Sequence, residues 1–303
     1  MLCLDTRTAQ VLNRLGLPEV RLITLPELES ADPELLSVKS TRLPVEYFWT
    51  CGPALLLHVL QRDSQIPMIT YLDSDQLFFS SLAPIYDELG DGSILIIEQR
   101  YLHREPGDHR FITRFNVGFL IFRRSAEGLA CLKRWREQCL TWCHDRQEGT
   151  LYGDQGYLTE WPERYRGVVV LQHPGGGVAP WNLRNHPLTT VDGQVRVAGV
   201  PLILFHFSGL RRVHRWLYEL HVWRYHHRRL NATVRRGIYA HYIRELARAE
   251  RRLRQIDGFQ RGGSYSRRSS AWRQARRALT NSQTSAPWIR WQRFMISLGP
   301  WVF

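Results

Sequence analysis

Two carboxylates, Asp73 and Asp75, end the apolar run of the segment PMITYLDSDQLFF at residues 67–79. Residues two apart on an extended chain point to the same side, so both carboxylates are expected at the carboxyl end of a strand. Ligands of open α/β sheets bind at that end. Converging carboxylates repel each other unless a cation lies between them, and their oxygens suit Mg²⁺ or Mn²⁺. A solvated turn or a cap on a following helix is the alternative.

A histidine, His206, follows a second apolar run in the segment PLILFHFSGL at residues 201–210. A histidine between two phenylalanines is usually a buried core residue, but at a strand end it can also face a site. Imidazole suits Mn²⁺ better than Mg²⁺. Asp73, Asp75 and His206 together would offer two oxygens and one nitrogen, with open positions for a diphosphate.

Two further polar pairs stand beside predicted secondary structure. Asn116 and Gly118 lie in FNVGF, where a strand asparagine needs partners for its amide and a strand glycine marks a bulge or a close approach. Asp154 and Gln155 lie between glycines at the start of a predicted helix. Asp154 would cap that helix, or the two side chains together would bind sugar hydroxyls. The glycine-rich loop at residues 173–182 matches neither a Walker A motif nor a dinucleotide fingerprint.

The elements that must position these residues alternate along the first two-thirds of the chain. This alternation predicts an α/β domain with a mixed, mostly parallel sheet flanked by helices. The predicted strands lie at 20–25, 67–73, 93–99, 115–122, 167–173 and 201–207, with an edge strand or hairpin at 192–197. One predicted helix starts at Pro53, and three more are predicted at 84–91, 125–144 and 237–256.

Charge divides the 303 residues unevenly, although the net charge of the whole chain is +13. Residues 1–210 carry 20 Lys and Arg against 24 Asp and Glu, whereas residues 211–303 carry 21 against 4. We therefore predict an α/β domain at 1–210, a basic helical extension at 211–260 and a flexible Arg- and Trp-rich tail at 261–303. Interleaved Trp and Arg favour an anionic membrane surface as the partner of residues 211–303, and nucleic acid is not expected.

Cellular location is predicted from what the sequence lacks. It has no run of 18 uncharged apolar residues and no signal-peptide pattern at the start. Its five cysteines have no paired spacing, which fits reduced thiols better than disulfides or a zinc site. These features predict a cytoplasmic protein, peripheral at the inner face of the membrane through its basic part.

Four motifs in order resemble the GT-A fold nucleotide-diphospho-sugar transferases, above all the family 8 type retaining glycosyltransferases. The motifs are YLDSD, FNVG, GDQGYL and HFSG, spread over residues 68–209. The resemblance implies a hexosyltransferase-like enzyme of cell-envelope polysaccharide. It would be Mn²⁺- or Mg²⁺-dependent, with a nucleotide-diphospho-sugar donor and a glycan or lipid-linked acceptor.

Roles for individual residues follow only from this resemblance. Asp73, Asp75 and His206 would hold the metal, and Asp154 and Gln155 would be the catalytic positions at the donor sugar. The implied substrate-binding residues are Asn116, Gly118, Lys39 and Gly209. The family's Leu-Asn after its Asp-Gln pair is absent here, because the sequence reads DQGYLTEW. The nucleophile stays open.

The start of the chain departs from the same pattern. These enzymes begin with a nucleotide-binding strand and a helix, whereas MLCLD corresponds to their second strand. The first nucleotide-binding strand is therefore expected to be missing. This leaves an alternative, an inactive transferase-like scaffold that acts through its basic tail. A metal-dependent phosphohydrolase would need further acidic clusters, and none is evident.

Overall fold

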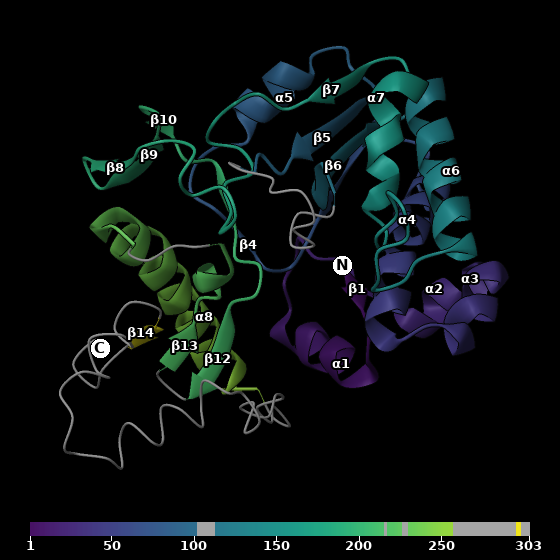
Figure 1. The fold of residues 1–303 in the computed structure, drawn as a ribbon. Helices are drawn as coiled ribbons and strands as arrows, with labels where there is room; N and C mark the ends of the chain where they lie inside the picture. Colours follow the sequence, from purple (N-terminus) through teal and green to yellow (C-terminus); the bar gives the residue numbers. More distant parts are fainter. Residues whose placement is uncertain (102–112, 215–216, 226–229, 257–294, 298–303) are drawn as a thin grey trace. The chain divides into compact units, whose positions relative to one another are not determined.

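The computed structural model divides the chain into two compact units, which Figure 1 shows with their elements labelled. The first unit contains Met1–Ser74 and Ser81–Gly177, and the second contains Asp75–Ser80 and Val178–Phe303. The structure describes residues 1–101, 113–214, 217–225, 230–256 and 295–297. Most of the predicted tail at 261–303 lies outside these residues. The predicted boundaries at 210 and 260 stay predictions.

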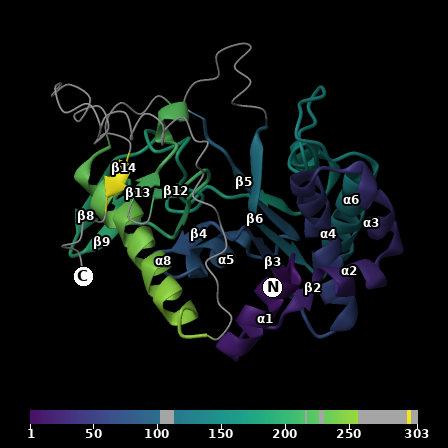
Figure 2. The ribbon, with the colours of Figure 1, turned by 90° about the horizontal axis from the view of Figure 1, so that it is seen from below.

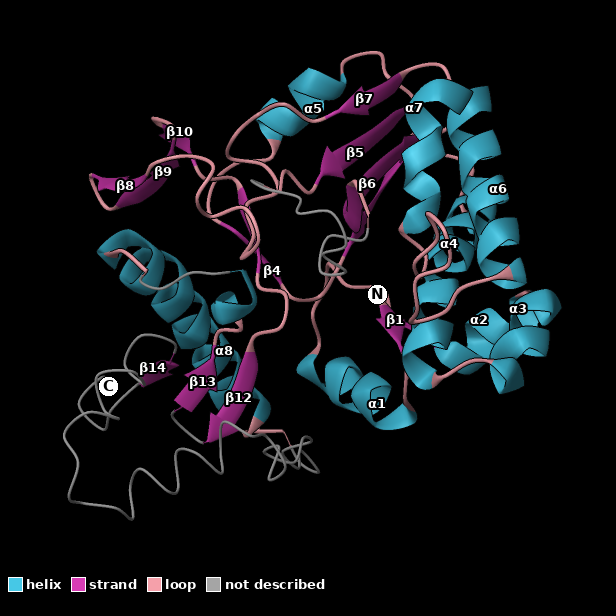
Figure 3. Cartoon of the chain, viewed as in Figure 1, coloured by secondary structure: helices cyan, strands magenta, loops and turns pink. Residues whose placement is uncertain are grey.

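The first unit is a mixed α/β structure, coloured by element type in Figure 3. Its helices are α1 (Thr6–Leu15), α2 (Leu25–Ala31), α3 (Pro33–Val38), η1 (Lys39–Thr41), α4 (Pro44–Arg62), α5 (Ala83–Leu89), α6 (Ala126–Thr141), η2 (Gly156–Glu160) and α7 (Trp161–Arg164). Its strands are β1 (Leu2–Cys3), β2 (Ile23–Thr24), β3 (Met68–Leu72), β5 (Ile94–Glu98), β6 (Phe115–Arg123) and β7 (Val168–Val170).

The central sheet of this unit has the order β3-β6-β5-β7, and β6 runs antiparallel to both of its neighbours. Only β5 and β7 pair in parallel within it. The prediction of a mostly parallel sheet was therefore wrong for the described strands. Parallel neighbours need a long crossover, whereas β5 and β6 follow one another in the chain and pair directly.

Helix α4 begins nine residues before the predicted start, so Pro53 lies inside the helix and not in its first turn. Pro44 occupies the first turn instead, where a missing N–H costs nothing. The Glu46 carboxylate accepts a hydrogen bond from the Leu43 N–H at 2.8 Å, which satisfies a free donor at the helix start. Burial of α4 against α6 outweighs the hydrogen bond lost at Pro53.

The core of the first unit lies between this sheet and helices α4 and α6, which lie side by side in Figures 1 and 2. Trp135 of α6 is fully buried, stacks on Phe122 at a ring distance of 6.1 Å and meets Trp161 edge-on at 5.7 Å. Large aromatic side chains therefore fix α6 to the sheet directly beneath the loop that carries Asp154.

The glycine-rich loop after β7 is held by charged side chains of the same unit. The Arg100 guanidinium donates to the Leu171 carbonyl and, at 3.2 Å, to the Gly176 carbonyl. The Glu88 carboxylate accepts from the His173 N–H at 3.0 Å. Gly177 has φ +76°, and a Cβ there would lie 2.4 Å from Ile97 Cγ2.

We expect Gly177→Ala to lower the free energy of unfolding by about 3 kcal/mol, since it combines a left-handed backbone with a clash against the buried β5. Gly193→Ala is the matched control, because Gly193 also has φ +76° but no atom lies within 4 Å of its Cβ position. Urea unfolding followed by circular dichroism measures both. Equal losses in the two variants would contradict the steric explanation.

The second unit contains small antiparallel sheets and one long helix. Its strands are β4 (Gln76–Phe78), β8 (Leu188–Val191), β9 (Gln194–Val197), β10 (Val200–Pro201), β11 (Leu204–His206), β12 (Arg211–His214), β13 (Leu217–Glu219) and β14 (Met295–Ser297). Its helices are η3 (Val222–Tyr225), the π-helical η4 (Thr233–Tyr239) and α8 (Ala240–Leu253).

Of two strand predictions in this unit, the strand at 201–207 was wrong in detail and the hairpin at 192–197 is confirmed. The run at 201–207 is not one strand, since β10 pairs with β9 whereas β11 pairs with β4. Pro201 provides no N–H, which limits continued pairing. The segment at 192–197 does form a hairpin with β8, but β9 is the central strand of its sheet and not an edge.

No helix among the described residues is long and apolar enough to cross a membrane. All five cysteines are buried free thiols. Helix α8 packs Tyr242 and Ile243 inward and exposes Arg248, Arg251 and Arg252. The predicted helix at 237–256 is therefore confirmed in its main part, with a π-helical first section.

Candidate functional site

Asp73 follows directly after β3, at the carboxyl end of that strand, as predicted. Its N–H donates to the Gly118 carbonyl of β6 at 3.0 Å, which continues the β3–β6 pairing by one residue. One carboxylate oxygen accepts from the Tyr71 hydroxyl at 3.0 Å. Asp73 is therefore held by two neighbouring strands of the first unit, its backbone by Gly118 of β6 and its side chain by Tyr71 of β3.

Asp75 and His206 form a pair within the second unit. His206 Nε2 lies 2.9 Å from Asp75 Oδ1, and the Phe207 N–H donates to the Asp75 carbonyl at 2.8 Å. The pairing of β4 with β11 fixes both residues, because Gln76 and His206 face each other in its register. Burial acts to raise the pKa of Asp75, but the hydrogen bond and charge of His206 outweigh it and lower that pKa.

The His206 ring is 7% exposed and meets the Trp181 ring edge-on at 5.5 Å. This packing limits the rotation of the imidazole and keeps Nε2 directed at Asp75. Trp181 was not predicted as a site residue. The glycine-rich composition of the loop around Trp181 was the sequence feature that could have indicated a site there.

Asp73 stays beside this pair because only Ser74 separates the two aspartates along the chain. Asp73, Asp75 and His206 form a group that could hold a metal ion. Two carboxylates and an imidazole are a suitable ligand set for Mn²⁺, while a purely oxygen set would suit Mg²⁺ better. The residues present therefore fit the predicted ion.

Asn116 and Gly118 lie where the pairing of β6 with β5 is irregular. Leu95 pairs with Ile121 and Ile97 with Asn116, so several residues of β6 are unmatched between them. Asn116 Oδ1 accepts from the Gly118 N–H at 2.9 Å. The two residues are thus joined to each other and, through the Gly118 carbonyl, to Asp73.

Asp154 is 3% exposed, and its Oδ2 has no hydrogen-bond partner. Burial, together with the charge of Asp73, raises the pKa of Asp154 to about 8. The Trp135 indole N–H donates to the Asp154 carbonyl at 2.9 Å and holds the backbone in place. A buried carboxyl group with an unsatisfied oxygen is costly, which is typical of a functional position.

Gln155 is half-buried and precedes η2, a 3₁₀-helix where an unspecified helix was predicted. Its side chain does not cap that helix. The bond from Trp135 to the Asp154 carbonyl holds the loop that carries Gln155. The adjacent Gly153 has φ +52°, and a Cβ there would lie 3.0 Å from the Trp49 ring.

The two remaining predicted site residues have close contacts of their own. Lys39 Nζ lies 2.7 Å from Glu29 Oε1 and 5.6 Å from the centre of the Tyr47 ring. Gly209 has φ +78°, and a Cβ there would lie 3.1 Å from His221 Cβ. The predicted substrate contacts of Lys39 and Gly209 stay predictions.

Besides Trp181, sequence reasoning missed the positioning side chains of Tyr71 and Trp135. Tyr71 lies two residues before Asp73 on an extended strand, so the alternation of side chains could have indicated it. Its ring packs edge-on against Trp135 at 6.5 Å. Trp135 is distant in sequence from both aspartates, and nothing in the linear pattern of α6 indicates its bond to Asp154.

We expect Tyr71→Phe to weaken Mn²⁺ binding by about tenfold, because it removes the hydroxyl that orients Asp73. Electron paramagnetic resonance of free Mn²⁺ during titration measures the affinity without reference to turnover. Tyr86→Phe is the matched control, since it removes a hydroxyl that lies 3.1 Å from Thr70 Oγ1 of the same strand. An unchanged affinity in Tyr71→Phe would contradict the orienting role.

Two proteins of Bacillus subtilis (strain 168) are similar to this chain. One, YfnD, is 34% identical over 250 residues, covering 82% of this chain and 79% of YfnD. The other, YfnF, is 34% identical over 220 residues, covering 70% of this chain and 72% of YfnF. Both are described as uncharacterized proteins. No protein-family model matches the chain.

Among solved structures, apo mouse xyloside xylosyltransferase 1 aligns with a TM-score of 0.40 and 14% identity over 69% of this chain and 83% of its own. The galactosyltransferase LgtC, in complex with donor and acceptor sugar analogs, aligns with a TM-score of 0.39 and 19% identity over 70% and 76% of the two chains. At such scores these similarities carry no argument about fold or activity.

Proposed function

The chain belongs to the family of the Bacillus subtilis proteins YfnD and YfnF, and we propose that it is a metal-dependent glycosyltransferase. It moves a sugar from a nucleotide-diphosphate donor to a glycan or lipid-linked acceptor, with retention of configuration. The descriptions of the two relatives name no activity, so the proposal rests on the residues of the site.

The observation that carries the proposal is the position of Asp73 between two sets of polar groups. Within the first unit its N–H is bonded to Gly118, and its charge acts on Asp154. Two residues along the chain, Asp75 is paired with His206 in the second unit. These are members of all four motifs that resemble the family 8 type transferases.

The proposed roles divide between metal and sugar. Asp73, Asp75 and His206 would hold Mn²⁺ or Mg²⁺, which would supply positive charge at the leaving nucleotide diphosphate. Asn116, Asp154 and Gln155 bind the hydroxyl groups of the donor sugar, since amide and carboxyl groups offer both donors and acceptors. A protonated Asp154 can donate a hydrogen bond at neutral pH, because its pKa is about 8.

The test is a screen of nucleotide-diphospho-sugars for Mn²⁺-dependent release of the nucleotide diphosphate, first with water and then with glycan acceptors. We expect turnover with at least one donor, its loss in EDTA and its return with added Mn²⁺. Activity that survives complete removal of divalent ions would overturn the metal-dependent proposal. Hydrolysis of simple phosphate esters at comparable rates would instead support a phosphohydrolase.

We also propose that residues 211–303 bind an anionic membrane surface, where a lipid-linked acceptor would be presented. In the described part of this segment, α8 exposes Arg248, Arg251 and Arg252 opposite its buried face. We expect the full chain to co-sediment with vesicles that contain phosphatidylserine and not with neutral vesicles. Arg251→Glu with Arg252→Glu should weaken this by about tenfold, and equal binding to neutral vesicles would count against the proposal.

A further inference from the structure

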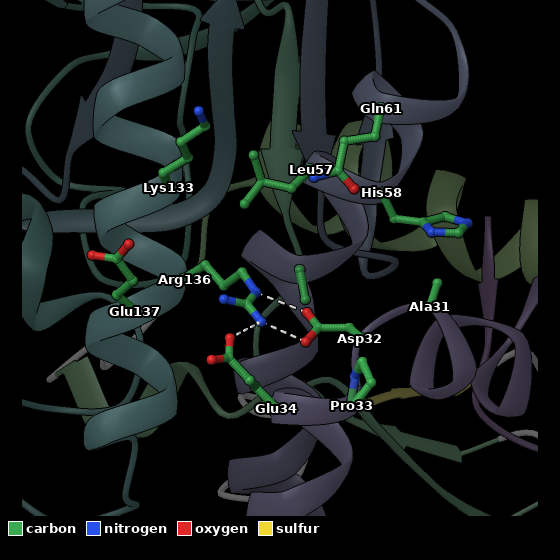
Figure 4. A pocket seen from close by; sticks show the side chains of 11 residues that line it. Ala31, Asp32, Pro33, Glu34, Leu57, His58, Gln61, Lys133, Arg136 and Glu137 are labelled. Carbon is green, nitrogen blue, oxygen red and sulfur yellow. Dashed lines mark hydrogen bonds and ion pairs between the residues drawn. The ribbon is translucent and has the colours of Figure 1, made fainter.

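A cavity of about 470 Å³ opens among the helices of the first unit and shares no residue with the site around Asp73. Figure 4 shows its walls, with Arg136 and Lys133 projecting from α6 and Gln61 and His58 from α4. The junction of α2 and α3, around Asp32, completes it. Its volume falls within the range of about 300–1,000 Å³ that is usual for small-molecule sites.

The strongest charges on the wall already have partners within the protein. Arg136 Nε donates to Asp32 Oδ2 at 2.7 Å, and the same guanidinium bonds the Glu34 carboxylate at 2.8 Å. Asp32 also accepts from the Leu35 N–H at 3.0 Å, as the cap of α3. The two carboxylates occupy the Arg136 guanidinium and leave one net negative charge, so this part of the wall does not attract an anion.

Four side chains of the cavity retain hydrogen-bonding capacity among the described residues. Gln61, Lys133 and Glu137 supply an amide, an ammonium group and a carboxylate, with opposite charges in equal number. His58 is 8% exposed, and its Nε2 has no hydrogen-bond partner. An unsatisfied buried polar atom on a side chain that lines the cavity is a group that a polar ligand can satisfy.

An apolar surface lies between these groups, formed by Leu57, Ala54 and Pro33. A phosphate would meet the carboxylates of Glu34 and Glu137, and a metal ion would meet the cations of Arg136 and Lys133. An uncharged ligand with several hydroxyl groups and one apolar face avoids both repulsions. It can use donors and acceptors alike.

We propose that this cavity is a second saccharide-binding site, which takes a mono- or disaccharide independently of the site around Asp73. The sugar hydroxyls bond Gln61, Lys133 and Glu137, and its apolar face lies on Leu57. Such a site would hold a distant part of a glycan chain or retain the protein on its polysaccharide. The proposal does not require that the protein transfers sugars.

The experiment uses the full chain in EDTA without nucleotide, and observes saturation-transfer difference NMR with methyl glycosides, lactose and maltose. Isothermal titration calorimetry then measures the affinity of the best binder. We expect the saccharide affinity to be unchanged in Asp73→Asn. It should fall by about tenfold or more in Gln61→Trp, because the larger side chain fills the cavity. Gln10→Trp on α1 is the matched control, since it places the same bulk on an exposed helix that does not line the cavity.

A second variant, Lys133→Ala with Glu137→Ala, removes two polar groups without adding bulk and should also weaken binding. Three outcomes would overturn the proposal. The first is no signal with any of these sugars, and the second is binding that is lost in Asp73→Asn but kept in Gln61→Trp. The third is binding of inorganic phosphate at the cavity in place of sugars.

Discussion

The Asp75→Asn variant is expected to lose about 1,000-fold in metal-dependent turnover of its nucleotide-sugar donor, together with tight Mn²⁺ binding. The substitution removes the charge of the carboxylate that lies 2.9 Å from His206 Nε2 and leaves an amide with one oxygen for the metal. Two ligands are weakened at once, because the imidazole also loses the partner that fixes its orientation.

Two measurements check this result separately. Electron paramagnetic resonance titration of Mn²⁺ reports the loss of binding, and release of the nucleotide diphosphate reports the loss of turnover. Asp73→Asn should behave alike, while Asp87→Asn on the exposed face of α5 should not differ from the unaltered protein. Unaltered Mn²⁺ affinity in both Asp73→Asn and Asp75→Asn would remove the basis for the metal site.

The Asp154→Asn variant is expected to be more stable than the unaltered protein by about 3 kcal/mol at pH 8 in EDTA, and at the same time inactive. Asp154 is 3% exposed with an unpartnered oxygen, so its ionised form is costly in the folded state. Asparagine has nearly the same shape and carries no charge, and Trp135 bonds the backbone carbonyl, which the substitution leaves in place.

The pH dependence of this difference follows from the pKa of Asp154. In the unfolded chain the carboxyl ionises near its ordinary value of 3.8, whereas in the folded chain it stays protonated until about pH 8. The unfolded state is therefore favoured increasingly as the pH rises through this window, and the loss levels off above it. The advantage of Asp154→Asn should grow from about pH 4 to about pH 8.

Urea unfolding at several pH values in EDTA measures this difference. Asp91→Asn, which changes an exposed aspartate of the same unit, should give no such trend. A destabilised Asp154→Asn, or a difference that does not vary with pH, would show that the carboxyl group is satisfied in the folded protein. Increased stability with lost turnover is the pattern expected when a buried carboxyl group is retained for function.

Parts of the fold were accessible from sequence because they depend on short-range patterns. The apolar runs that became β5 and β6 are mostly buried and that of β3 is half-buried, and their composition marks all three as strands. The rule that proline favours the first helical turn fits both Pro53 and Pro44, and α4 begins at Pro44, nine residues before the predicted start. Burial against α6 decided between the two prolines, and burial is not a local property.

The sequence pattern also did not predict whether neighbouring strands pair in parallel or antiparallel. Alternation of strands and helices favours parallel pairing, yet β6 is antiparallel to β3 and to β5. Each strand reads as equally apolar in either orientation, since direction is set by which neighbours meet in the folded sheet. Similarly, the run at 201–207 became two strands because its first residue pairs with β9 and its later residues pair with β4.

By itself the sequence determined which residue types stand at which strand ends: Asp73 and Asp75 after one apolar run, and His206 at the end of another. Side-chain alternation and the chemistry of oxygen and nitrogen ligands were sufficient for that. The contact of Asp75 with His206 and the burial of Asp154 near the charge of Asp73 depend on the tertiary structure. The first is a contact between residues that are distant in sequence, and the second is the environment of a buried group. Both depend on how the chain packs and not on the local sequence.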